Sequence, residues 1–137
     1  MLFRSNANTF ESYMTFDVGQ LCTVLSVKVR VFGKLSSSNP ANLKVSAFPV
    51  SNTSWTETGI TWNNKPAAGS LLATATVLNT TDAWYEWDVT AFVRAEITAG
   101  RHIVSIALKD QANTSNQGIF NSRQAASNKP QLVVVTP

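Results

Sequence analysis

Few side chains in this sequence could act as an acid, a base or a nucleophile. Its 137 residues include eight carboxylates, and cleavage of a glycosidic bond normally requires two of them facing each other across a cleft. Glu86 and Asp88 are two positions apart, so on a strand they would share one face at a spacing of about 7 Å. Asp88 also stands where the cap of a helix is expected, and we prefer that structural role. The carboxylates therefore do not predict a catalytic pair.

His102 and Cys22 are the sole histidine and the sole cysteine. His102 is in phase with Val104 and Ile106, which predicts a buried or half-buried structural histidine rather than the base of a Ser-His-Asp triad. Cys22 cannot form an internal disulfide, and its apolar neighbours predict a small buried side chain. One histidine and one cysteine cannot build a zinc site, and no phosphate-binding glycine loop, HExxH or CxxC motif occurs. We therefore predict that the chain is not an enzyme.

Side chains suited to holding a sugar are more evident. Sugar-binding faces combine aromatic rings that stack on the sugar with hydrogen-bonding side chains, and acidic sugars add a requirement for Lys or Arg. Lys28 and Arg30 would lie on one face of one strand, and we expect Lys44 to align beside them on a neighbouring strand. The alternative is that these charges only keep a polar strand face soluble.

Aromatic residues offer a second element of such a site. Trp84 and Trp87 fall on opposite faces of their strand, so at most one of them is buried. An exposed Trp84 with Tyr85 nearby would provide a stacking platform.

The composition indicates one compact domain over residues 1–137, because 44% of the residues are hydrophobic and only 14% are charged. The net charge of +3 includes no run of adjacent Lys or Arg, so nucleic-acid binding is not predicted. No apolar run of 18 residues occurs, which predicts no membrane insertion. Residues 1–5 lack the apolar region of a signal peptide, so secretion would depend on sequence that is not present in this chain.

Apolar and polar residues alternate along most of the chain, which is typical of half-buried strands. The strand candidates are 12–18, 26–32, 43–48, 71–78, 84–89, 101–108, 118–122 and 131–136. About eight short strands at this spacing predict an antiparallel β-sandwich or barrel.

The segment 88–97 breaks this alternation, because its apolar residues recur at intervals of three and four. Asp88 or Thr90 could cap a helix there, and Gly100 could end it. We predict a short helix that closes one end of the sandwich.

The most distinctive segment reads WTETGITWNNKP at residues 55–66. Each of its two tryptophans can bury roughly 150–250 Å². The residues between and after them are turn formers, which indicates a reversing backbone rather than a helix. We expect Trp62 to be a core residue or the anchor of a loop.

This segment resembles the W-x-E-x-x-I-T-W-N-N-x-P hallmark of bacterial and archaeal DNRLRE domains, which overlap the family 96 carbohydrate-binding modules attached to polysaccharide-degrading enzymes. Further landmarks follow the family's order: SYMTFD at 12–17, WYEWDVTAFV at 84–93, VSIAL at 104–108, FNSRQA at 120–125 and KPQL at 129–132. Each motif alone is weak, but their order and spacing extend the resemblance over roughly residues 5–136.

The chain departs from the family at its start. Members usually begin with a further early strand and an Asn/Gly-rich loop, whereas this chain begins at or just before what would be the second strand. A missing strand would leave an open sheet edge, so we expect a homodimer through that edge. Calcium is associated with some modules of this kind, but part of its site would lie in the missing segment and Gln124 replaces the usual Glu. We therefore assign no metal ligands and predict no cofactor.

The resemblance implies a jelly-roll-like all-β sandwich with one short helix that binds an extracellular or cell-surface polysaccharide without catalysis. Alginate-binding members use basic positions, and we add the aromatic platform to them. The candidate ligand-binding residues are Lys28, Arg30, Lys44, Arg123, Trp84 and Tyr85. For Arg123 we prefer a structural ion pair with Asp17 or Asp88. The alternative function is a structural or adhesion module of a surface protein with no glycan ligand.

Overall fold

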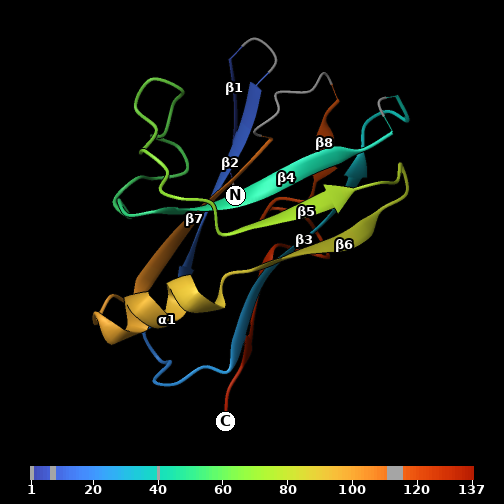
Figure 1. Cartoon of the computed structure of the whole chain (residues 1–137). Helices are drawn as coiled ribbons and strands as arrows, with labels where there is room; N and C mark the ends of the chain where they lie inside the picture. The colour runs from blue at the N-terminus through green and yellow to red at the C-terminus, as the bar shows by residue number, and fades with distance from the viewer. Residues whose placement is uncertain (1, 7–8, 40, 111–115) are drawn as a thin grey trace.

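The computed structural model describes residues 2–6, 9–39, 41–110 and 116–137. Within these ranges the chain forms nine strands and one helix (Figure 1). In chain order they are β1 (Leu2–Asn6), β2 (Thr9–Asp17), β3 (Ser26–Leu35), β4 (Leu43–Val50), β5 (Ala73–Val77), β6 (Ala83–Asp88), α1 (Thr90–Thr98), β7 (Ile103–Lys109), β8 (Gly118–Phe120) and β9 (Gln131–Val135). The strands form two antiparallel sheets, which confirms the predicted all-β sandwich with one short helix.

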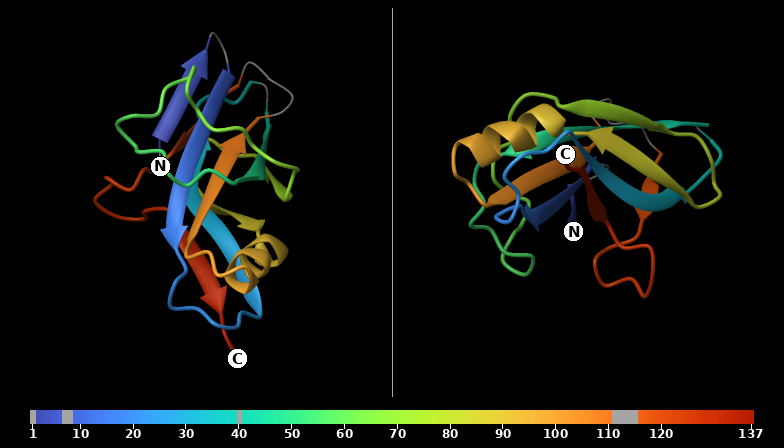
Figure 2. Two further views of the ribbon diagram at one scale, coloured as in Figure 1. Left: turned by 90° about the vertical axis from the view of Figure 1, so that its left-hand side faces the viewer. Right: turned by 90° about the horizontal axis from the view of Figure 1, so that it is seen from below.

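The larger sheet has the strand order β1-β2-β7-β4-β5. β1 pairs with β2 from Leu2↔Tyr13 to Asn6↔Thr9, and Figure 2 shows the two strands side by side at the edge of this sheet. A strand therefore does precede the SYMTFD segment, so the expectation of a missing first strand with an open edge along β2 is wrong. β1 and β7 pair with the two edges of β2, so the open edge that suggested a homodimer does not lie along β2, and the homodimer itself stays a prediction.

The smaller sheet is built around β3. β6 pairs with one edge of β3, from Lys28↔Asp88 to Gly33↔Ala83. Two strands share the other edge, since β9 pairs with residues 26–30 and β8 with residues 33–35. β3 is thus bonded along both edges, and its outward-facing side chains lie in the middle of a sheet face.

The core lies between the two sheets. In β3, Val27, Val29 and Val31 are fully buried, while the alternate residues face outward and are partly exposed. Val104 and Ile106 of β7 meet them from the larger sheet and are equally buried. The period-two alternation of the sequence therefore assigned the faces of these strands correctly.

The helix α1 lies at one end of the sandwich (Figure 1), as predicted from the change of period. Just before it, the Asp88 carboxylate accepts a hydrogen bond from the Thr90 N–H at 2.9 Å. The Thr90 hydroxyl accepts the Val27 N–H at 2.9 Å, which fixes the start of the helix to β3. After the helix, Gly100 has a φ of 73°, a left-handed conformation that glycine adopts without a steric penalty.

The long connection between β4 and β5 covers part of the outer face of the larger sheet. A second buried cluster there consists of Tyr13, Val50, Ile60 and Ala107, with Trp55 packed against it. The Trp55 indole N–H donates to the Ser105 hydroxyl at 2.9 Å. The WTETGITWNNKP segment thus forms a second small core together with side chains of β2, β4 and β7, and Trp62 is a half-buried loop residue.

Two expectations about single side chains are wrong. Cys22 is exposed, because it lies in an irregular segment between β2 and β3 rather than in a strand. His102 is also exposed, because β7 begins only at Ile103 and the histidine stands outside the sheet. In the described part of the chain, no helix has the length and apolar character needed to cross a bilayer.

Candidate functional site

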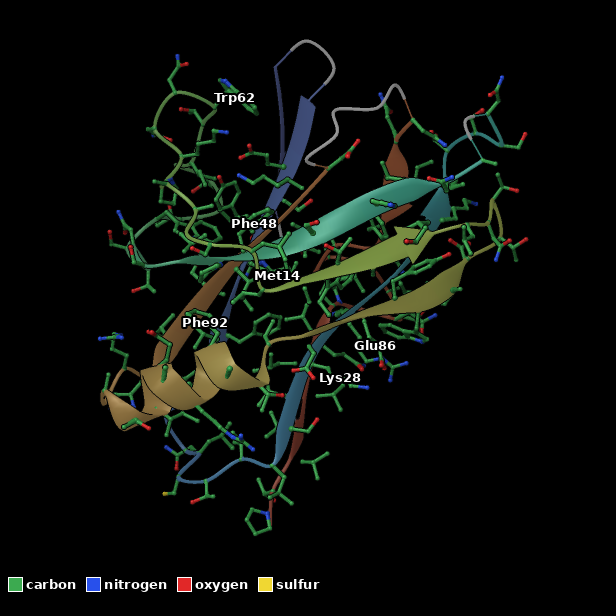
Figure 3. The ribbon with its side chains drawn as sticks, in the orientation of Figure 1. Met14, Lys28, Phe48, Trp62, Glu86 and Phe92 are labelled. Atoms are coloured by element: carbon green, nitrogen blue, oxygen red, sulfur yellow. The ribbon has the colours of Figure 1, made fainter. Side chains whose placement is uncertain are left out.

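Two basic side chains of β3 face two acidic side chains of β6 on the outer side of the smaller sheet. Lys28 lies opposite Asp88, and Arg30 lies opposite Glu86. Glu86 contacts both bases: its carboxylate oxygens lie 3.2 Å from Lys28 Nζ and 3.8 Å from Arg30 Nε. Figure 3 shows Lys28 and Glu86 close together on this side of the molecule. The predicted alignment of Lys28 with Arg30 is therefore present, with an acidic residue between them.

An aromatic cluster continues the same face. Trp84 points outward and is half-buried, whereas Trp87 is fully buried, as their spacing predicted. The Arg30 guanidinium carbon lies 4.1 Å from the centroid of the Trp84 ring, a cation–π contact. Phe32 lies directly opposite Trp84, with the two ring centroids 5.3 Å apart in an edge-to-face arrangement. We use the name β3–β6 outer face for the surface formed by Lys28, Arg30, Phe32, Trp84 and Glu86.

Tyr85 does not take part in this platform. It follows Trp84 in the strand and therefore points to the opposite side of the sheet, where it lies opposite the buried Val31. Its ring packs against the core and contacts Phe120 edge-to-face at 6.4 Å. The expectation of a joint platform with Trp84 is wrong, because adjacent residues of a strand point to opposite faces of the sheet.

Lys44 lies on a different sheet from Lys28 and Arg30. It is exposed on β4 of the larger sheet, opposite Thr76 of β5. The neighbours of β3 are β6, β8 and β9. The predicted alignment of Lys44 is therefore wrong, because the chain crosses from one sheet to the other between β3 and β4.

Arg123 makes an ion pair, but with a partner that the sequence did not suggest. Its Nε lies 2.5 Å from an oxygen of Glu57, rather than at Asp17 or Asp88. Glu57 belongs to the WTETGITWNNKP segment, so the pair connects the turn after β8 to the loop over the larger sheet. The structure thus places Arg123 in the kind of role that we preferred for it.

Phe32 and Lys34 were not proposed as ligand-binding residues from the sequence, and Glu86 was considered there only as half of a catalytic pair. Phe32 and Lys34 are in phase with Lys28 and Arg30, so the alternation could have identified them. Glu86 could be recognised as their neighbour only from the pairing of β3 with β6. Lys34 Nζ lies 3.7 Å from an Asp82 carboxylate oxygen. Together with the neighbouring Lys34, Asp82 and Asp88, the face and its surroundings thus hold three bases and three acids.

The acidic residues of this face are engaged as structural partners. Hydrogen bonds from the Thr90 side chain and backbone lower the pKa of Asp88, so this carboxyl is held ionised. Glu86 lies in ion pairs with Lys28 and Arg30. A general acid must hold a proton near neutral pH, and the lowered pKa of Asp88 works against that role. Within the described residues, no cluster of three or more His, Cys, Asp and Glu side chains could hold a metal ion.

An antiparallel β-sandwich with aromatic and basic side chains on one open strand face has the build of a carbohydrate-binding module. The model of carbohydrate-binding module family 96 matches residues 2–136, and the chain belongs to this family. The chain is also similar to a gellan lyase of Bacillus sp, with 32% identity over 126 residues that cover 89% of this chain. It spans only 5% of the length of that lyase.

Proposed function

We propose that this module binds an extracellular polysaccharide along the β3–β6 outer face and catalyses no reaction itself. The observation that carries the proposal is the contact of Arg30 with Trp84, which places a guanidinium and an indole ring on one partly exposed surface. Sugar rings stack their C–H faces on indoles, and a guanidinium donates in pairs to carboxylates and hydroxyls. The family and the gellan lyase similarity support carbohydrate as the class of ligand.

The preferred ligand is an acidic polysaccharide. Lys28 and Arg30 converge on the single carboxylate of Glu86, which occupies the position that a uronate group of a sugar would take. All three side chains are partly exposed, so a ligand carboxylate can reach the bases and replace Glu86 as their partner. Binding would then exchange one carboxylate for another beside the aromatic cluster.

Affinity electrophoresis tests this proposal in gels that contain alginate, pectin, gellan, xylan or no polymer. We expect retardation by the three acidic polymers that weakens with salt, because exposed charge contacts are screened. The Lys28→Ala/Arg30→Ala variant should bind them about tenfold more weakly or worse, since hydrogen bonds to charged groups are worth about 1.5–3 kcal/mol each. Lys44→Ala removes a positive charge from the other sheet and should change little. Unchanged wild-type mobility in every gel would overturn the proposal and favour a structural or adhesion role.

The Glu86→Gln variant separates an acidic ligand from a neutral one. Removing the internal carboxylate frees Lys28 and Arg30, so binding to the acidic polymers should tighten by about two- to tenfold. Affinity for xylan should not rise. If the variant bound acidic polymers more weakly than the wild type, Glu86 would itself contribute to binding, and the proposed replacement of its carboxylate by that of the ligand would be wrong.

A further inference from the structure

A pocket of about 270 Å³ lies in the loop between β4 and β5, away from the β3–β6 outer face. Its lining residues are Asn52, Ser54, Trp55, Thr56, Gly59, Ile60, Asn64 and Pro66. The loop lies over the larger sheet, whereas the proposed polysaccharide face belongs to the smaller one. In Figure 3 Trp62, which is part of this loop, lies far from Lys28 and Glu86. The two sites therefore do not share residues.

The lining of this pocket is polar but uncharged. Amides and hydroxyls come from two Asn, one Ser and one Thr, while Trp55, Ile60 and Pro66 provide apolar surface. The charged side chains of the same segment are directed to other partners. Glu57 pairs with Arg123, and Lys65 Nζ lies 2.7 Å from a carboxylate oxygen of Glu11. Hydroxyl-rich uncharged ligands match such a lining, whereas an ion placed there would lack a counter-charge.

The walls of the pocket are held by hydrogen bonds within the loop. Asn64 accepts the Thr61 N–H and donates its amide to the Gly59 carbonyl. The Thr56 hydroxyl accepts the Gly59 N–H at 3.1 Å. On the other side, the Trp55 ring is fixed by Ser105 and by an edge-to-face contact with Tyr13 at 5.9 Å. A pocket whose walls are already bonded loses little conformational entropy on binding.

Several polar groups at this pocket still have hydrogen-bonding capacity. The Asn52 carboxamide oxygen accepts from the Ser54 N–H and hydroxyl, but its amide group makes no hydrogen bond among the described residues. The Thr56 hydroxyl accepts from Gly59 and keeps its own proton to donate. Asn52 and Thr56 therefore have donors, and Ser54 has an acceptor, that are available for the hydroxyl groups of a ligand.

We propose that this pocket is a second binding site, which takes a single neutral pyranose unit. Its volume is just below the range of roughly 300–1,000 Å³ that is typical of drug-sized ligands, so it suits one ring rather than a chain. Trp55 supplies an aromatic wall, and Asn52, Ser54 and Thr56 supply the hydroxyl partners. Such a site would bind a chain end or a side branch, while the β3–β6 outer face follows the polymer backbone.

Titrations followed by ¹⁵N–¹H NMR spectra test this site on the wild-type chain. The probes are the methyl β-glycosides of glucose, galactose, mannose and xylose, with methyl β-glucuronoside as the charged counterpart of the glucoside. We expect at least one neutral glycoside to shift the backbone amides of residues 52–66 and the Trp55 indole signal. The glucuronoside should bind the pocket about tenfold more weakly than the glucoside, if the glucoside binds. An absence of shifts in 52–66 with all neutral probes would overturn the proposal, as would equal shifts from the charged and uncharged pair.

Two variants distinguish this site from the polysaccharide face. Thr56→Val keeps the side-chain shape and removes the hydroxyl, while the Gly59 N–H keeps its hydrogen bond to the Thr56 carbonyl at 3.2 Å. The variant should bind the neutral glycoside about three- to tenfold more weakly. Arg30→Ala should leave the loop shifts unchanged while it weakens polymer retardation. A loss of the loop shifts in Arg30→Ala would contradict a separate site. Loop shifts in a chain that no polymer retards would support the pocket and overturn only the polysaccharide face.

Discussion

Replacing Trp87 by alanine is expected to lower the free energy of unfolding by about 3–5 kcal/mol. Trp87 is fully buried in β6, between the two sheets. Its indole N–H donates to the Val45 carbonyl of β4 at 2.8 Å, so one side chain connects the smaller sheet to the larger one. Truncation would leave a large cavity in the core and would also remove this inter-sheet hydrogen bond.

Urea denaturation monitored by far-UV circular dichroism measures this effect for Trp87→Ala, with Trp84→Ala as the matched control. Trp84 is three residues away on the same strand, but it is only half-buried on the outer face, so we expect a loss of about 1 kcal/mol. The loss of unfolding free energy in Trp87→Phe should lie between those of the two alanine variants, because phenylalanine fills most of the cavity but cannot donate a hydrogen bond. Equal losses for the two alanine variants would contradict the assignment of Trp87 as the inter-sheet connection.

Replacing Lys65 by alanine should lower the free energy of unfolding by about 3 kcal/mol at pH 7, although the residue lies in a loop. Its ammonium group lies 2.7 Å from a carboxylate oxygen of Glu11, which is only 6% exposed. The Tyr13 hydroxyl donates to the same carboxylate at 2.8 Å. Lys65 Nζ also lies 3.6 Å from the centroid of the Trp62 ring. Removal of the lysine leaves a buried carboxylate without its ion-pair partner and removes one of the contacts between the WTETGITWNNKP segment and β2.

The pH dependence of this loss follows from the pKa of Glu11. Burial alone would raise it, but hydrogen bonds from Lys65 and Tyr13 and the attraction of Lys65 and Lys109 outweigh burial, so the pKa in the folded chain lies below the usual 4.5. A lowered folded pKa gives stability that is present above the unfolded pKa and is lost as the pH falls through the folded one. In the Lys65→Ala variant, burial becomes the dominant influence on Glu11, so we expect the pKa of Glu11 to be raised. Protonation of Glu11 in acid then removes the buried charge and with it the destabilisation of the variant.

Urea unfolding of wild type and Lys65→Ala between pH 7 and pH 4 checks this prediction. The difference in stability should be largest at pH 7 and should narrow as the pH approaches 4. Glu11→Gln/Lys65→Met, which removes both charges and keeps similar volumes, should recover most of the loss. Lys44→Ala, an exposed lysine of the same sheet face, should change stability by less than about 0.5 kcal/mol. A difference that stayed constant over this pH range would show that Glu11 is not the group left without a partner.

Together these two variants separate two kinds of stabilisation in the fold. Trp87 joins the sheets through the main core, whereas Lys65 holds the β4–β5 loop on the outside of the larger sheet. Because that loop lines the proposed sugar pocket, Lys65→Ala should disturb the pocket more than it disturbs the β3–β6 outer face.

The strands β2 to β9, the helix and the face of β3 that each residue occupies could be predicted from the sequence, whereas β1 could not. Val27, Val29 and Val31 point into the core, whereas Lys28 and Arg30 point outward. Successive side chains of a strand point to opposite faces of the sheet. The same period placed Trp84 outside and Trp87 inside, and the order of motifs identified the family. The facing of each side chain is a local property that a short stretch of chain carries by itself, and the order of motifs is read directly along the chain.

The pairing of strands could not be predicted from the sequence and is known from the three-dimensional structure. Lys44 lies on the other sheet, Arg123 pairs with Glu57, and Glu86 stands between Lys28 and Arg30. The partners of β3 come from β6, β8 and β9, all more than 40 residues further along the chain, while β4, the next strand, joins the opposite sheet. The alternation of residues along a strand predicts which face of the sheet each side chain occupies. It does not predict which strands pair, because pairing depends on chain connections that cross from one sheet to the other. The candidate face and the pocket both depend on that long-range pairing and packing.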